Sequence, residues 1–224
     1  MKKKIALIGG SGFIGHNLAI ELSKKGNEIF IVDSLSVNNL YSFKEEEFEN
    51  KTLYKSILNN RIELLNFNNI HLQIQDARDY NSLSQYLSSI KPDVIIMLAA
   101  VSHANKSNKD PHNTFDHSIR TLENCLDIAR GLNKNSHYCH LIYFSSSMVY
   151  GNFKSDKVNE DAICEPIGIY DTLKYSGELI VKSYNRVFDL PYTIVRPSAL
   201  YGERCVSRRV TQIFIENAVQ GKDI

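Results

Sequence analysis

The chain has 224 residues, of which 43% are hydrophobic, so it can form one large domain with a sizeable buried core. A formal net charge of +1 argues against a nucleic-acid-binding protein, and no apolar run approaches the ~20 residues of a membrane-spanning helix. Four cysteines without a Cys-x-x-Cys pair fit a reducing compartment, and the histidines show no metal-ligand spacing. We therefore expect a cytoplasmic protein without a metal site.

The N-terminal segment has the pattern of a βαβ unit. Ile5–Ile8 is a short apolar run typical of a buried strand, and Phe13–Lys25 carries apolar residues at helical spacing. Gly26 follows as a helix stop. Glu28–Val32 is predicted as the second strand, which ends at Asp33.

The rest of the chain continues to alternate strands with helices. Residues 34–69 are polar and are predicted to form a surface insertion that carries a helix such as Leu53–Leu65. The later predicted strands are His71–Gln75, Val94–Ala100, Leu141–Ser145 and Tyr192–Arg196, and the later predicted helices are Tyr80–Ile90, Thr114–Gly131, Tyr170–Val187 and Phe214–Gln220. This alternation predicts an α/β fold with a doubly wound parallel sheet, in which ligands bind beyond the carboxyl ends of the strands.

A glycine-rich loop connects the first predicted strand to the first predicted helix. Gly9, Gly12 and Gly15 have the spacing that allows a tight turn, close approach of backbone to a pyrophosphate, and close packing of the helix on the strand. The N-terminus of the helix offers free N–H groups and a positive dipole end to phosphate. The plainer alternative, a turn without a ligand, does not account for the flanking strand and helix.

Aspartates follow the second and third predicted strands. Asp33 can accept hydrogen bonds from an adenosine ribose and repel a 2′-phosphate, which favours NAD over NADP. Asp76 leaves two alternatives open, because it can meet the adenine amino group or cap the next helix.

A second set of polar residues follows the fifth predicted strand. Tyr170 and Lys174 are four residues apart and share one face of a helix. A nearby ammonium would lower the pKa of the phenol, whose phenolate could then take a proton from a substrate alcohol while hydride leaves for NAD. One serine of the run 145–147 could hydrogen-bond the same substrate oxygen. Taken singly, the Tyr-x-x-x-Lys spacing and the serine run can each arise by chance.

The order of these motifs along the whole chain resembles the extended short-chain dehydrogenase/reductase family, and more narrowly its NAD-dependent epimerase/dehydratase branch, which acts on nucleotide sugars. The motifs that carry the resemblance are the glycine loop, Asp33, Asp76, Leu98-Ala99-Ala100, the sequence Ser-Ser-Ser-Met-Val-Tyr-Gly at 145–151, Tyr170 with Lys174, and Arg196-Pro197-x-x-x-Tyr201-Gly202. The resemblance implies a Rossmann fold with NAD as its cofactor.

The resemblance also implies individual roles. Ser146 would be the catalytic serine, with Ser147 as the fallback, Tyr170 the acid/base, and Lys174 the residue that orients the nicotinamide ribose. The implied cofactor-binding residues are Gly9, Gly12, Phe13, Ile14, Gly15, Asp33, Asp76, Ala77, Leu98, Ala99, Ala100, Tyr170, Lys174 and Pro197.

One departure from the family narrows the expected reaction. Sugar 4,6-dehydratases of the family carry an Asp-Glu pair directly after the catalytic serine or threonine, where this chain has Ser147 and Met148. We therefore expect a 4-epimerase, a 4-dehydrogenase or a keto-reductase rather than a dehydratase. A reductase of small ketones is a further alternative.

The resemblance finally implies how the chain is organised. Residues 1–224 would form the NAD-binding Rossmann domain, and residues from about 198 onward would begin the substrate-binding part. The smaller C-terminal substrate domain would be largely absent, so the chain would be truncated, and an NAD-binding module without turnover is the alternative function. Helices after the fourth and fifth strands often form a dimer interface in the family, which implies a homodimer.

Overall fold

The structure is a computed structural model that describes residues 2–37, 39–43, 49–101, 104–206 and 210–223. Within this part of the chain, a six-stranded sheet has the order β3-β2-β1-β4-β5-β6, and every pair of neighbouring strands is parallel. The strands are β1 (Lys4–Ile8), β2 (Glu28–Asp33), β3 (His71–Ile74), β4 (Val94–Met97), β5 (His140–Phe144) and β6 (Tyr192–Val195). The strand order reverses between β1 and β4, which confirms the expected doubly wound Rossmann fold.

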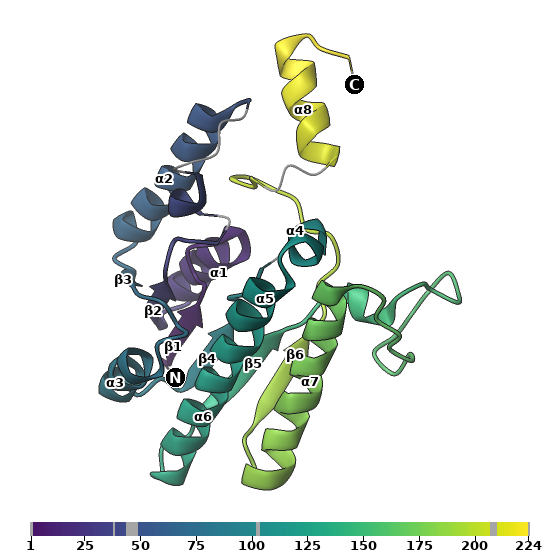
Figure 1. Ribbon diagram of the computed structural model, residues 1–224. Coiled ribbons are helices and arrows are strands. Elements are labelled where there is room, and N and C mark those ends of the chain that lie inside the picture. The colour runs from purple at the N-terminus through teal and green to yellow at the C-terminus, as the bar shows by residue number, and fades with distance from the viewer. Residues whose placement is uncertain (1, 38, 44–48, 102–103, 207–209, 224) are drawn as a thin grey trace.

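Helices cover both faces of the sheet (Figure 1). They are α1 (Phe13–Lys24), α2 (Lys51–Phe67), α3 (Tyr80–Ile90), α4 (Ala104–Lys109), α5 (Pro111–Phe115), α6 (Thr121–Lys134), α7 (Ile169–Phe188) and α8 (Val210–Gln220). Short helical turns occupy η1 (Leu40–Phe43), η2 (Asp116–Arg120) and η3 (Ser147–Tyr150), of which η2 is a π-helix.

The core has two apolar layers, one on each side of the sheet. Alternate residues of β1 face opposite layers: Ala6 and Ile8 pack with α3, α6 and α7, while Ile5 and Leu7 pack with α1 and α2. A central parallel strand is buried on both faces, so its sequence is almost continuously apolar.

Two predicted elements differ from the structure. The strand predicted over Val94–Ala100 ends at Met97, because the N–H groups of Leu98 and Ala99 both donate to the Ile8 carbonyl, each at 2.9 Å. The chain thereby bends across the carboxyl end of β1. The helix predicted over Thr114–Gly131 is divided into α5, η2 and α6, and its first turn begins at Pro111, capped by Asp110.

Three further predicted helices are longer in the structure, and the one predicted over Tyr170–Val187 covers Ile169–Phe188. The last helix begins at Val210 rather than Phe214, and the helix of the insertion covers Lys51–Phe67 rather than Leu53–Leu65. Among the described residues, no helix combines the length and apolar character needed to cross a membrane.

Candidate functional site

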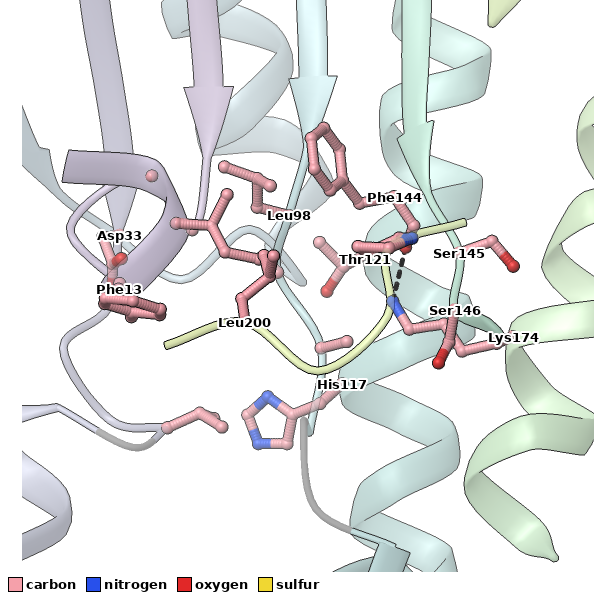
Figure 2. A pocket seen from close by; sticks show the side chains of 18 of the residues that line it. Phe13, Asp33, Leu98, His117, Thr121, Phe144, Ser145, Ser146, Lys174 and Leu200 are labelled. Atoms are coloured by element: carbon pink, nitrogen blue, oxygen red, sulfur yellow. Dashed lines mark hydrogen bonds between the residues drawn. The ribbon is translucent and has the colours of Figure 1, made fainter. Parts of the chain in front are cut away.

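A cavity of about 610 Å³ lies beyond the carboxyl ends of the strands, between the glycine loop and α7 (Figure 2). Its size is in the range of small-molecule and cofactor sites. Every residue predicted from the sequence for catalysis or cofactor binding lines this cavity. They are Gly9, Gly12, Phe13, Ile14, Gly15, Asp33, Asp76, Ala77, Leu98, Ala99, Ala100, Ser146, Tyr170, Lys174 and Pro197. Their individual roles stay predictions.

The glycine loop is shaped by contacts that a side chain would obstruct. Gly9 has φ +80°, and a Cβ there would lie 2.7 Å from the Ala99 nitrogen. A Cβ on Gly15 would lie 2.5 Å from the Gly10 carbonyl oxygen. The loop therefore brings bare backbone to the cavity wall at the N-terminus of α1, as binding of a pyrophosphate requires.

Asp33 joins the end of β2 to the glycine loop. Its carboxylate accepts hydrogen bonds from the backbone N–H of Ser11 at 3.0 Å and from that of Leu35 at 2.8 Å. Burial raises the pKa of Asp33, while these hydrogen bonds and the charge of Arg61 oppose the rise. The carboxylate is thus oriented at the cavity wall, where it can accept further hydrogen bonds.

Asp76 follows β3 and is held by its neighbour Arg78. The Arg78 guanidinium donates to both carboxylate oxygens of Asp76, with a shortest distance of 2.6 Å, and this pairing lowers the pKa of Asp76. Asp79 caps α3 instead, by accepting from the N–H of Ser82 at 3.1 Å. The helix-capping alternative for Asp76 is therefore wrong, because Asp79 stands closer to the first turn.

The three serines after β5 have different surroundings. Ser145 and Ser146 are both buried and both line the cavity, but the Ser145 hydroxyl donates to Glu178 at 2.5 Å, whereas the Ser146 hydroxyl accepts from the N–H of Met148 at 3.2 Å. Ser147 also lines the cavity. Ser145 and Ser146 consequently point in different directions (Figure 2). The serine run alone does not distinguish them.

The Lys174 ammonium lies near the phenol of Tyr170 on the same face of α7. Lys174 Nζ donates to the Phe144 carbonyl at 2.7 Å and lies 6.0 Å from the centre of the Tyr170 ring. Burial lowers the pKa of Lys174 to about 8, so the amine is still mostly charged at neutral pH. The helical spacing predicted from the sequence therefore brings a cation to the phenol.

A buried ion pair below the serines was not predicted from the sequence. Glu178 is fully buried, and the Arg196 guanidinium donates to its two carboxylate oxygens at 2.9 and 2.6 Å. Arg196 also donates to the Tyr150 hydroxyl at 2.9 Å. The sequence spacing could have indicated Glu178, because it lies four residues after Lys174 and so shares its helical face.

Other residues of the cavity wall were also not predicted, and two of them come from the segment around the start of α6. His117 belongs to the π-helix η2, Thr121 begins α6, and both line the cavity. A regular helix across this segment gave no reason to single out either residue, since the π turn changes the direction in which side chains project.

The fold and the cavity together define a dinucleotide-binding α/β domain that places a serine, a tyrosine and a lysine beside the ligand site. The NAD dependent epimerase/dehydratase family matches residues 5–224. The chain belongs to this family.

Two curated relatives and one solved structure illustrate the likeness. Protein CapI of Staphylococcus aureus is 33% identical over 89% of this chain and 54% of its own length. The dTDP-D-glucose 4,6-dehydratase of Dictyostelium discoideum is 28% identical over 98% of this chain and 49% of its own length. The UDP-glucuronic acid 4-epimerase of Bacillus cereus, crystallised with UDP-glucuronic acid and NAD, is 25% identical with a TM-score of 0.81, over 98% of this chain and 64% of its own. The chain therefore spans about half the length of these curated relatives.

Proposed function

We propose that the chain binds NAD and belongs to a nucleotide-sugar 4-epimerase, 4-dehydrogenase or keto-reductase. The observation that carries the proposal is the meeting of Ser146, Tyr170 and Lys174 in the same cavity as the glycine loop. Those segments are far apart in the sequence, and a purely structural role does not require them to share a ligand-sized cavity.

The shape of the glycine loop supports NAD as the ligand. At Gly9 and Gly15 the space that a Cβ would fill is already occupied by neighbouring backbone, so only glycine allows this tight turn, and both residues line the cavity. Asp33 would accept hydrogen bonds from the adenosine ribose, and Pro197 would lie against the nicotinamide. The remaining predicted wall residues would enclose the dinucleotide between these ends.

The catalytic roles that we propose are proton transfer and orientation. Tyr170 would take a proton from the sugar hydroxyl through its phenolate, and the nearby ammonium of Lys174 favours that ionised form. Ser146 would hydrogen-bond the same sugar oxygen. NAD supplies a hydride acceptor when it is bound. Lys174 would in addition orient the nicotinamide ribose.

The proposed reaction does not include 4,6-dehydration. One matched relative is a dTDP-D-glucose 4,6-dehydratase, so family membership alone leaves this reaction open. Ser147 and Met148 provide neither the acid nor the base that elimination of water across C5 and C6 of the sugar requires. This local chemistry supports an epimerase or an oxidoreductase.

The partner that we propose is a nucleotide sugar. Residues from 198 onward would begin its binding part, which is supported by the lining of the cavity by Ser198, Ala199 and Leu200. The cytoplasmic location, the homodimer and the division into domains stay predictions.

The proposal is tested with purified chain, NAD and a panel of UDP-, GDP-, dTDP- and CDP-sugars, with the absorbance of reduced nicotinamide as the readout. We expect one class of sugar to reduce bound NAD, and Tyr170→Phe to slow that reduction roughly a hundredfold to ten-thousandfold. Tyr175→Phe is the control, because Tyr175 lies on the same helix outside the cavity lining.

The outcomes distinguish an NAD-dependent enzyme from an NAD-binding module without turnover. If Tyr170→Phe reduced NAD as fast as the unchanged chain, the acid/base role would be wrong. If NAD bound but no sugar reduced it, the chain would be a cofactor-binding module without turnover.

A further inference from the structure

The imidazole of His117 projects from the helical segment before α6 into the cavity (Figure 2). The residue is half-buried, and nothing in the described part of the chain hydrogen-bonds to its ring nitrogens. An imidazole retains two polar nitrogens that need partners once water is excluded. A ligand that fills the cavity would therefore meet an uncommitted hydrogen-bonding group.

Ion pairs next to His117 fix the position of the π-helix that carries it. Asp116, the residue before it in the π-helix, accepts from the Arg78 guanidinium at 2.8 Å, and the same guanidinium binds Asp76 after β3. Arg78 thus connects Asp116 of the π-helix with Asp76 at the carboxyl end of β3. Single π turns are frequent at functional sites because they redirect a side chain.

The other basic side chains of the described cavity wall are already engaged. Arg61 donates its Nε and Nη2 to the Arg204 carbonyl, the first at 3.1 Å, and Lys174 donates to the Phe144 carbonyl. His117 is the basic wall residue without a hydrogen-bond partner in the described structure. The His117 imidazole is thus available to donate a hydrogen bond to an anionic ligand group in the cavity.

We propose that His117 contacts the diphosphate of the bound dinucleotide and takes up a proton when the dinucleotide binds. The inference rests on the proposed binding of NAD. The glycine loop would hold the diphosphate from one side of the cavity, and the imidazolium of His117 would hold it from another. The affinity for NAD then rises as the pH falls.

The charges around His117 fix the sign of this dependence. Burial lowers the pKa of His117, as does the charge of Arg78, while Asp76, Asp116 and Asp110 act in the opposite direction. The ring is therefore mostly neutral at neutral pH before the ligand arrives. A doubly negative diphosphate raises the pKa of a nearby imidazole, so binding draws a proton from solution.

The test is isothermal titration calorimetry of NAD between about pH 6 and pH 8, with each pH repeated in two buffers of different ionisation enthalpy. We expect the Kd for NAD to rise roughly three- to tenfold from pH 6 to pH 8, with proton uptake on binding. His117→Gln keeps a hydrogen-bonding side chain that does not titrate, and it should bind NAD with a flat profile and no such uptake. His112→Gln is the matched control, since His112 is exposed on α5 and lies outside the cavity lining.

Each outcome has a separate meaning. Equal pH dependence in the unchanged chain and in His117→Gln would overturn the role of His117 while leaving NAD binding intact. Loss of the dependence in His112→Gln would also overturn it. No binding of NAD by any of the three chains at any pH would overturn the proposed function itself.

Discussion

At the scale of single residues, one buried carboxylate connects the segments that carry the candidate catalytic groups. Glu178 lies on α7 with Tyr170 and Lys174, accepts from Ser145 at the end of β5, and pairs with Arg196 at the end of β6. Removing one partner of a buried pair leaves the other charge uncompensated, which costs more than an exposed pair contributes.

Glu178→Gln is therefore expected to lower the free energy of unfolding by about 3–5 kcal/mol, measured by urea denaturation. The matched control is Glu165→Gln, whose partner Lys154 lies on an exposed loop and whose loss should cost about 1 kcal/mol or less. Equal effects of the two substitutions would show that the buried pair is not a major support of this part of the fold.

At the scale of elements, α7 can reach β5 only because residue 177 has no side chain. A Cβ on Gly177 would lie 2.2 Å from the Tyr143 hydroxyl, which donates at 3.3 Å to the Lys174 carbonyl. This close approach also lets Lys174 reach the Phe144 carbonyl. Gly131 in α6 offers a comparison, because a Cβ there would meet nothing within 4 Å.

Gly177→Ala and Gly131→Ala are expected to change stability in opposite directions. The first should lower the free energy of unfolding by about 1–3 kcal/mol through overpacking. The second should raise it by about 0.5–1 kcal/mol, because alanine loses less conformational freedom in a helix. Urea denaturation of both variants measures the difference, and a Gly177→Ala chain as stable as Gly131→Ala would refute the close-packing argument.

Helix and strand ends were the least predictable features at this scale. The end of β4 at Met97 depends on hydrogen bonds from the next residues to Ile8 on a neighbouring strand. The π-helix η2 is fastened through Asp116 to Arg78, which lies 38 residues earlier. Apolar periodicity contains no information about such distant partners.

At the scale of the whole molecule, the cavity draws its walls from both halves of the chain. After β6, the chain contributes Ser198, Ala199, Leu200, Cys205 and Val206 to the cavity wall, and Figure 2 labels Leu200 among them. Arg204 donates to His16 Nε2 at 3.0 Å, and burial lowers the pKa of His16 to about 4, so the neutral ring can accept. A ligand in the cavity should therefore stabilise both halves together.

NAD at one hundred times its Kd is accordingly expected to raise the free energy of unfolding by about 2.7 kcal/mol. The increase should appear in a single thermal transition detected both by circular dichroism and by tyrosine fluorescence. Two transitions, of which NAD moved only the first, would contradict the coupling of the halves through the cavity.

The sequence by itself determined the local features of this protein. The apolar runs indicated the strands, because strands buried on both faces exclude polar side chains. The spacing of Gly9, Gly12 and Gly15, and the four-residue interval from Tyr170 to Lys174, indicated the site, because both follow from local backbone geometry.

Only the tertiary structure decided features that depend on distant partners. It separated Ser145, whose hydroxyl donates to the buried Glu178, from Ser146, whose hydroxyl accepts from the N–H of Met148. It assigned Asp76 to Arg78 rather than to a helix cap, and it brought His117 into the cavity wall. The Ser145 outcome depends on a side chain that is remote in sequence and the His117 outcome on a local departure from regular helix, whereas Asp76 pairs with Arg78 only two residues away. Hydrophobic periodicity encodes none of the three.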